Sequence, residues 1–377
     1  MYNDVYYSIF FDTSQVIHEI FLTKFDFYVN RLYITIRKVT GFEIMVTIQE
    51  IARRAGLSRY TVSKVLNGNN TVRPAAREKV FALCRELGYV PNLNAVNLVR
   101  KKSSLIGLIV PFITDGFYSS LIEKLEHLVQ SRGYMLIYRS SYNNAEFECS
   151  AIRQFLSMNV CAMLIVPVVE KPDAETHLLA AKNVPVIYLD RPYSDDTCCI
   201  LNDNVASAGE MTEHLLKRTK DLAFLDSFYR SANPTAADRR KGYESVMRRH
   251  HLKPTIISFP DLAGTQDNED YAYEVMKTFF RSGRSCTGLF CVTDAAAFGA
   301  ARAARESGRS PGQDFFIGGH DDLRFSAYAN PPITTMKQPQ DEICETALSL
   351  LIRRLNGEKP AKLRYVFPSS LIVRKSG

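Results

Sequence analysis

From Ser104 onward, short apolar runs alternate along the chain with amphipathic segments such as residues 119–132. Alternation of this kind is typical of a doubly wound α/β fold with parallel sheets. Because roughly 270 residues exceed one comfortable hydrophobic core, we expect two α/β lobes. The apolar runs predicted as strands are LIGLIVP, YMLIY, AMLIVP, VPVIYLD, DLAFLD, GLFCVTD and DFFIGGH.

Residues 47–67 have a helical pattern instead. In residues 47–55 (TIQEIARRA) the apolar positions recur at helical spacing, and Thr47 with Glu50 can form a capping box. Gly56 suits the left-handed end of this helix, and Ser58 suits the start of a second helix over 59–67.

A third helix is predicted after the break at residues 67–70. Pro74 can occupy its first position, and Gly88 can end it. Its expected apolar stripe is Val80, Phe81, Cys84 and Leu87.

Two short helices joined by a tight glycine-containing turn make a helix-turn-helix, whose second helix enters the major groove of DNA. Arg59 and Lys64 on that helix can donate to guanine O6 and N7, and Tyr60 can contact a thymine methyl or a phosphate. An ordinary helical hairpin with a solvated basic face fits the same pattern, and periodicity alone leaves both interpretations open.

Composition and charge agree with a folded, DNA-binding protein. The chain is 46% hydrophobic and 23% charged, with a formal net charge of +7, and basic residues concentrate between 53 and 85. The 8 cysteines show no C-x-x-C spacing, so we expect reduced thiols in a cytoplasmic protein. No apolar run is long enough to predict a transmembrane helix.

Residues 1–44 are rich in Phe and Tyr and contain no Pro. They lack the basic start and the cleavage site of a signal peptide. Two interpretations stay open. The segment is either upstream sequence before a true start at Met45, or an accessory segment that packs on the DNA-binding domain or a partner.

The run from Thr47 through Asn92 resembles, without gaps, the signature of the LacI-type (lac repressor) family of bacterial transcriptional regulators. The resemblance implies that Arg59, Tyr60 and Lys64 read bases. It implies phosphate contacts from Thr47, Ser58, Thr61, Ser63 and Asn67. One departure is Arg73, where the family usually has a capping Ser, and Pro74 partly compensates for it.

Residues 92–103 resemble the family's hinge helix, which folds on the operator. The resemblance makes Leu98 the apolar wedge that enters a central base step, with Asn92 and Ala95 as further DNA contacts. A plain connector is the alternative for this Asn- and Lys-rich stretch.

Residues 104–377 resemble the periplasmic-binding-protein-like core of the same family, whose lobes close around a ligand. The motifs are DGFY (115–118), LDRP (189–192), RRKGY (239–243), CVTDAAAFGAA (291–301), GGHDD (318–322) and TTMKQP (334–339). The effector-binding residues expected from family position are Phe117, Tyr118, Asn233, Thr235, Arg239, Thr293 and Asp321. Arg239 as donor and Asp321 as acceptor can clamp adjacent hydroxyl groups, which favours a sugar or sugar derivative.

Structural roles are expected for several neighbours of these residues. Asp190 and Arg191 suit an ion pair at the lobe interface, and Asp294 suits a helix cap. Thr293 stands where relatives commonly have Asn, and His320 replaces a usual aromatic residue. A packed His320 is the expectation, with pH sensitivity as the alternative.

The predicted architecture is a small all-α helix-turn-helix domain joined to a two-lobe α/β periplasmic-binding-protein-like core with parallel sheets. Its expected parts are a leader (1–44), a DNA-binding domain (45–91), a hinge (92–103), an N-terminal lobe (104–202 with 335–360) and a C-terminal lobe (203–334 with 361–377). The predicted function is a cytoplasmic repressor, a homodimer on a pseudo-palindromic DNA operator, controlled by a small-molecule effector. We expect no cofactor, no metal and no membrane partner.

Two other function classes fit less well. A sugar-binding protein of a transport system would share the two-lobe core, but it would carry a signal peptide and lack residues 47–102. An enzyme would need a catalytic motif, and the chain has no GxSxG, P-loop, HExxH or complete dinucleotide fingerprint. We therefore predict no catalytic residues.

The hinge assignment predicts that Leu98→Ala weakens operator binding and leaves effector binding intact, because the truncated side chain no longer opens the central base step. Gel-shift titration of wild type and variant on the same operator measures the effect. Unchanged operator affinity would contradict the hinge assignment.

Overall fold

The computed structural model describes residues 46–66, 71–90, 103–168, 174–226, 233–258 and 268–377. The chain divides into two compact units, residues 1–101 and residues 102–377. Of the predicted DNA contacts, Asn67, Asn92, Ala95 and Leu98 lie outside the described residues, as does the leader.

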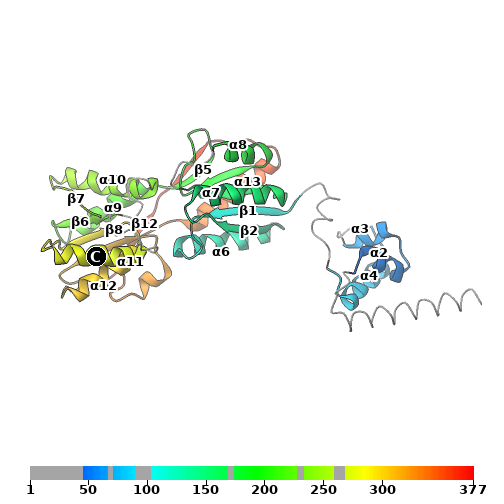
Figure 1. Ribbon diagram of the computed structural model, residues 1–377, viewed down its shortest axis with the longest axis horizontal. Coiled ribbons are helices and arrows are strands. Elements are labelled where there is room, and N and C mark those ends of the chain that lie inside the picture. Colours follow the sequence, from blue (N-terminus) through cyan, green and yellow to red (C-terminus); the bar gives the residue numbers. More distant parts are fainter. Residues whose placement is uncertain (1–45, 67–70, 91–102, 169–173, 227–232, 259–267) are drawn as a thin grey trace, which may run out of the picture. The chain divides into compact units, whose positions relative to one another are not determined.

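The first unit contains the three predicted helices, α2 (Ile48–Ala55), α3 (Arg59–Leu66) and α4 (Pro74–Leu87) (Figure 1). They enclose a small core, and its fully buried side chains are Ile51, Val62, Val65 and Val80. The helical spacing of apolar residues therefore predicted this part of the fold correctly.

The predicted helix ends are present as well. The Thr47 hydroxyl oxygen accepts a hydrogen bond from the Glu50 amide at 3.3 Å, and Gly56 ends α2 with a φ of 65°. Ser58 Oγ accepts from the Thr61 amide at 3.1 Å. Each bond satisfies a backbone donor that a helix terminus leaves without a helical partner.

Two details of this unit differ from the prediction. The Glu50 carboxylate does not close a capping box but pairs with Arg53 Nη2 at 2.9 Å and Arg54 Nε at 2.7 Å. Phe81 is 39% exposed, although it was predicted in the buried stripe of α4. The buried stripe of α4 runs through Val80 and the half-buried Cys84. Phe81 follows Val80 directly, so its side chain is turned about 100° around the helix axis, away from that stripe.

The second unit contains two six-stranded sheets, ordered β11-β5-β4-β3-β1-β2 and β12-β10-β9-β8-β6-β7. Among the described strands only the β10–β12 pair is antiparallel. The strands of the first sheet are β1 (Leu105–Val110), β2 (Met135–Ser140), β3 (Ala162–Ile165), β4 (Val186–Leu189), β5 (Cys199–Asn202) and β11 (Arg364–Phe367). Those of the second are β6 (Leu222–Leu225), β7 (Thr255–Ile257), β8 (Gly288–Cys291), β9 (Phe316–His320), β10 (Thr334–Lys337) and β12 (Ser370–Ile372).

Helices pack in pairs in each lobe, α6 with α13 and α7 with α8 in the first. In the second lobe α9 packs with α10 and α11 packs with α12 (Figure 1). Their bounds are α6 (Gly116–Ser131), α7 (Ala145–Ser157), α8 (Ala174–Asn183), α9 (Asn204–Leu216), α10 (Pro234–Arg249), α11 (Asn268–Arg281), α12 (Asp294–Glu306), α13 (Gln340–Leu355) and the short 3-10 helix η2 (Arg324–Ala327). This is the predicted two-lobe α/β core. No helix in the described part of the chain is long and apolar enough to cross a bilayer.

The chain crosses between the lobes after β5, after β10 and after β11. Two predicted lobe boundaries therefore move. Residues 335–337 were assigned to the first lobe, but β10 pairs with β9 in the second sheet. Residues 364–367 were assigned to the second lobe, but β11 pairs with β5 in the first sheet. Strand pairing decides both positions, and the amino-acid pattern of a short strand does not specify its partner.

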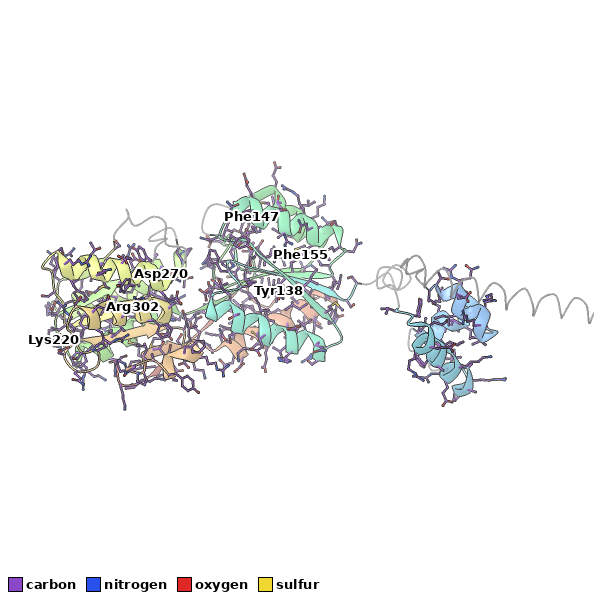
Figure 2. The ribbon with its side chains drawn as sticks, turned by 60° about the horizontal axis from the view of Figure 1, so that its bottom comes forward. Tyr138, Phe147, Phe155, Lys220, Asp270 and Arg302 are labelled. Carbon is purple, nitrogen blue, oxygen red and sulfur yellow. The ribbon has the colours of Figure 1, made fainter. Side chains whose placement is uncertain are left out.

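The burial of each strand explains whether the apolar pattern of the sequence predicted it. All six residues of β1 are buried, so this strand reads as one continuous apolar run. The edge strand β2 has half-exposed Met135. Tyr138 on the same strand is also half-exposed (Figure 2). Strands β5, β7, β10, β11 and β12 were not predicted, because each is 3 or 4 residues long and contains at least one polar side chain.

Gly299 on α12 lies close to the backbone of α11, and a Cβ there would collide with the Glu269 carbonyl oxygen. We predict that Gly299→Ala destabilises the core by about 1–3 kcal/mol, because backbone atoms cannot rotate away. Urea unfolding of the full chain measures the loss. Arg302→Ala, on the exposed side of the same helix, is the control and is expected to change stability by less than about 1 kcal/mol (Figure 2). Equal effects of the two variants would contradict the packing argument.

Candidate functional site

The outer surface of α3 carries the three side chains predicted to read bases. Val62 and Val65 turn inward, which leaves Arg59 and Tyr60 exposed, the latter by 69%. Lys64 Nζ lies 4.7 Å from the centre of the Tyr60 ring. A cation over an aromatic face is held by the ring's negative potential, so these two side chains support each other's orientation.

The described residues predicted to contact phosphates lie at helix starts or on α3. Thr47 and Ser58 use their oxygens as acceptors for helix amides, which leaves the Thr47 hydroxyl hydrogen to donate. Thr61 and Ser58 share a hydrogen bond of 2.9 Å between their hydroxyl oxygens, and Ser63 is half-buried on α3. Their role toward DNA stays a prediction.

A cavity of about 90 Å³ lies between the two lobes of the second unit. It is formed where strands end and helices begin, the usual ligand position in open α/β sheets. All seven residues predicted to bind the effector line it. The full lining is Pro111, Phe112, Asp115, Phe117, Tyr118, Asn143, Asp190, Arg191, Asn233, Thr235, Ala236, Arg239, Asn268, Val292, Thr293, Asp321 and Gln338.

Three helix N-termini meet at this cavity, and each is capped by a residue of its lining. Asp115 Oδ1 accepts from the Phe117 amide at 2.8 Å at the start of α6. Asn233 caps α10 through the Thr235 amide at 3.1 Å, and Thr293 caps α12 through the Ala296 amide at 3.1 Å. Asn233 and Thr293 thus have a structural role as well as their predicted place in the site.

Arg239 and Asp321, the predicted clamp, form a buried ion pair with 3.2 Å between Nη2 and Oδ1. Arg239 also donates from Nε to Asn204 Oδ1 at 2.9 Å and from Nη1 to the Val292 carbonyl at 2.7 Å. The sequence suggested a fork of free donors, but all three guanidinium nitrogens of this residue already have protein partners.

Asp321 is held from several sides. Its Oδ1 also accepts from Gln338 Nε2 at 2.8 Å and lies 3.0 Å from His320 Nδ1. Within the described residues no protein donor reaches Oδ2. Although burial opposes it, the positive charge of Arg239 together with hydrogen bonds from His320 and Gln338 lowers the pKa of Asp321. Its backbone φ of 109° is rare for a non-glycine residue, and such strain concentrates at functional sites.

His320 is fully buried, as expected of a packed side chain. Burial and the nearby charge of Arg239 lower its pKa to about 4, so the ring is neutral at pH 7. Nδ1 then carries the proton toward Asp321, and Nε2 lies 3.0 Å from Ser207 Oγ. The ring therefore orients Asp321 rather than sensing pH near neutrality.

The sequence prediction missed several residues of the lining. Asp190 and Arg191 form the expected ion pair, with 3.6 Å between Oδ2 and Nε, yet both also line the cavity. The Tyr118 hydroxyl donates to Asp190 Oδ2 at 2.9 Å. Arg191 Nε and Thr235 Oγ1 are buried and have no hydrogen-bond partner in the described structure. Asp115 and Gln338 were within the quoted motifs DGFY and TTMKQP, which was the available signal.

Asp294 was predicted to cap α12, but Thr293 does so. The Asp294 carboxylate instead accepts from the Leu323 amide at 2.9 Å, Ser326 Oγ at 2.5 Å and Thr335 Oγ1 at 2.6 Å. Burial raises its pKa to about 7 despite these bonds. It anchors the segment after β9, just behind the cavity.

Comparison with known proteins finds a matching family description for part of each unit. Residues 47–92 match "Bacterial regulatory proteins, lacI family", and residues 212–377 match "Periplasmic binding protein-like domain". The chain belongs to the LacI family of bacterial regulatory proteins. The resemblance inferred from the helix-turn-helix run and the core motifs is confirmed.

The chain matches relatives in the LacI family over nearly the whole length of those relatives. The Ribose operon repressor of Halalkalibacterium halodurans is 28% identical over 332 residues, covering 88% of this chain and 97% of that protein. The HTH-type transcriptional repressor PurR of Erwinia tasmaniensis is 28% identical over 337 residues, with the same coverage of 88% and 97%. The structure resembles the lac repressor dimer bound to operator with a TM-score of 0.75 and 25% identity, covering 88% of this chain and 99% of that one.

The charge of Asp115 gives a pH-dependent prediction for this LacI-family core. Burial and the negative charges of Asp321 and Asp190 raise the pKa of Asp115 to about 6. The folded state therefore holds this proton more tightly than the unfolded chain. Ionisation costs stability above pH 6, and that cost vanishes below the ordinary value of 3.8.

We predict that Asp115→Asn stabilises the core by about 1–2 kcal/mol at pH 8 and has little effect near pH 4, because Asn is also a good helix cap. Urea unfolding at both pH values measures the difference. Glu123→Gln, on the exposed side of α6, is the control. Destabilisation by Asp115→Asn at pH 8 would mean that the carboxylate stabilises the fold there.

Proposed function

We propose that this protein is a sequence-specific DNA-binding repressor of transcription, whose affinity for its operator is controlled by a small-molecule effector in the cavity between the lobes. One observation carries the proposal. The same chain contains a helix-turn-helix with Arg59, Tyr60 and Lys64 on its outer side and a polar cavity at the strand ends of a two-lobe core.

DNA recognition follows from the chemistry of α3. Arg59 and Lys64 can donate to guanine O6 and N7 in the major groove, and each such pairing discriminates against a wrong base by about 1–3 kcal/mol. Thr47, Ser58, Thr61, Ser63 and Asn67 fit the phosphates, which set the register of the protein on the duplex. Leu98, with Asn92 and Ala95, fits the minor groove at the operator centre.

The effector site supports control of this binding. A cavity of about 90 Å³ is smaller than the roughly 300–1,000 Å³ typical of small-molecule sites. A ligand that enters must therefore displace lining side chains or separate the lobes. Because the chain crosses between the lobes at three places, a change in their angle is a hinge motion that a ligand can favour.

Names of relatives favour a sugar or a similar small polar molecule as the effector. One is called a ribose operon repressor, and a structure of 25% identity is the lac repressor bound to ONPG. Phe117, Tyr118, Asn233, Thr235, Arg239, Thr293 and Asp321 are the proposed contacts. We expect a coupling of about 1–3 kcal/mol between effector and operator binding.

We further propose that the working unit is a homodimer on a pseudo-palindromic operator, in the cytoplasm. One of the similar structures is a lac repressor dimer on its operator. A two-fold dimer presents two α3 helices to two half-sites, so the operator is expected to mirror that symmetry. The relatives found carry regulator names, and we assign this chain no reaction.

Selection of bound sequences from random DNA by the full chain tests the proposal, and a pseudo-palindrome is expected. Lys64→Ala should then relax preference at one base position in each half-site, at a cost of about 1–3 kcal/mol for the preferred base. Lys79→Ala, on the exposed side of α4, is the matched control and should leave every base preference unchanged. A uniform loss of affinity in Lys64→Ala would assign Lys64 to the phosphates. Failure to enrich any sequence would contradict the function itself.

A further inference from the structure

The cavity between the lobes has an unequal set of charges, and the inference drawn from them rests on the proposed effector site. Its lining contains three carboxylates, Asp115, Asp190 and Asp321, but two guanidinium groups, Arg191 and Arg239. Among the described residues, the lining includes no Lys, His or Glu. When fully ionised, this described lining therefore carries one net negative charge.

Both guanidinium groups already form ion pairs and hydrogen bonds with other residues of the protein. Arg239 contacts Asp321, Asn204 Oδ1 and the Val292 carbonyl, as described above. Arg191 Nη1 donates to Asn143 Oδ1 and to the Pro167 carbonyl, each at 3.1 Å, and its Nε faces Asp190. Each guanidinium group is already paired with a carboxylate, Arg239 with Asp321 and Arg191 with Asp190, so an anionic ligand adds a negative charge that neither group is left to balance.

The helix N-termini offer little to an anion either. Backbone amides at the start of a helix bind phosphate or carboxylate when they are free. Here the starts of α6, α10 and α12 are capped by Asp115, Asn233 and Thr293. The cap of α6 is itself a carboxylate, which occupies the place that a ligand anion would need.

Acceptors for hydrogen-bond donors are, in contrast, available. Asp321 Oδ1 takes all three hydrogen bonds that His320, Arg239 and Gln338 provide, so Oδ2 is left for a donor from a ligand. The Thr235 hydroxyl, which has no hydrogen-bond partner among the described residues, can serve a hydroxyl or ether oxygen of that ligand. This combination suits hydroxyl groups, which both donate and accept.

We propose that the cavity takes an effector without negative charge, a neutral polyhydroxylated molecule or its amino derivative, and rejects the corresponding carboxylate or phosphate. The ligand places a hydroxyl or ammonium donor on Asp321 Oδ2. An acid group in this small space lies near Asp115, Asp190 or Asp321, and the described lining has no unpaired cation to offset it. Rejection therefore comes from charge rather than from size.

Matched ligands test the proposal on the full-length protein at pH 7.5. The probes are ribose with ribonate and ribose 5-phosphate, glucose with gluconate, glucose 6-phosphate and glucosamine, and cellobiose with cellobionate. Thermal shift finds binders, and calorimetry gives their dissociation constants. We expect at least one neutral or amino sugar to bind, and its acid and phosphate to bind about tenfold or more weakly. An acid or phosphate that binds as tightly, or a complete lack of binding by the neutral and amino sugars, overturns the proposal.

A charge variant separates charge from shape. Asp115→Asn keeps the helix cap and the size of the side chain but removes one carboxylate. We expect it to reduce the ratio between the dissociation constants of the acid and the neutral sugar by about threefold or more, whereas Glu123→Gln on the same helix leaves the ratio unchanged. A ratio that Asp115→Asn does not alter overturns charge as the cause.

Operator binding distinguishes this inference from the proposed function. An anionic ligand that binds and changes operator affinity overturns the charge selection, while the protein remains an effector-controlled repressor. A neutral sugar that binds while its acid and phosphate bind weakly, in a protein without any operator preference, supports the charge selection and overturns the repressor.

Discussion

The buried ion pair between Arg239 and Asp321 is the interaction on which the cavity depends. Arg239 comes from α10 and contacts the carboxyl end of β8 and the start of α9, through Val292 and Asn204. Asp321 follows β9 and receives Gln338 from the segment that crosses to the first lobe. Leaving either charge alone in this interior would be costly, so the pair fixes several elements of the second lobe and the crossing segment at one point.

The parallel sheets explain why that point is also a site. Consecutive parallel strands require helical crossovers, so strand ends and helix starts collect at the same edge of each sheet. Asp115, Asn233 and Thr293 occupy three of these helix starts. The requirement for helix caps thus places polar side chains around the cavity, and ligand chemistry uses residues that the fold needs in any case.

Electrostatics then sets the charge state of the cavity. Burial acts on Asp115 and Asp321 alike, but only Asp321 has a guanidinium group and the donors His320 and Gln338 on one of its oxygens. Its pKa falls, whereas the pKa of Asp115 rises to about 6 beside two other carboxylates. Neutral His320 contributes orientation and not charge, because its own pKa lies near 4. The cavity near neutral pH is therefore acidic, with its positive groups turned toward the protein.

The sequence alone determined the helix-turn-helix, the α/β class, the two lobes and the seven residues of the expected effector site that share one cavity. Local signals carry this information: helical spacing, caps at Thr47 and Gly56, continuous apolar runs, and motifs that resemble a family. Tertiary structure decided what depends on distant partners. It placed β10 and β11 in their sheets through strand pairing, exposed Phe81, and turned the donors of Arg239 inward. It also brought Asp115, Asp190 and Asp321 into one space, and only that closeness gives the cavity its charge, because electrostatic energy depends on distance in the fold and not on separation along the chain.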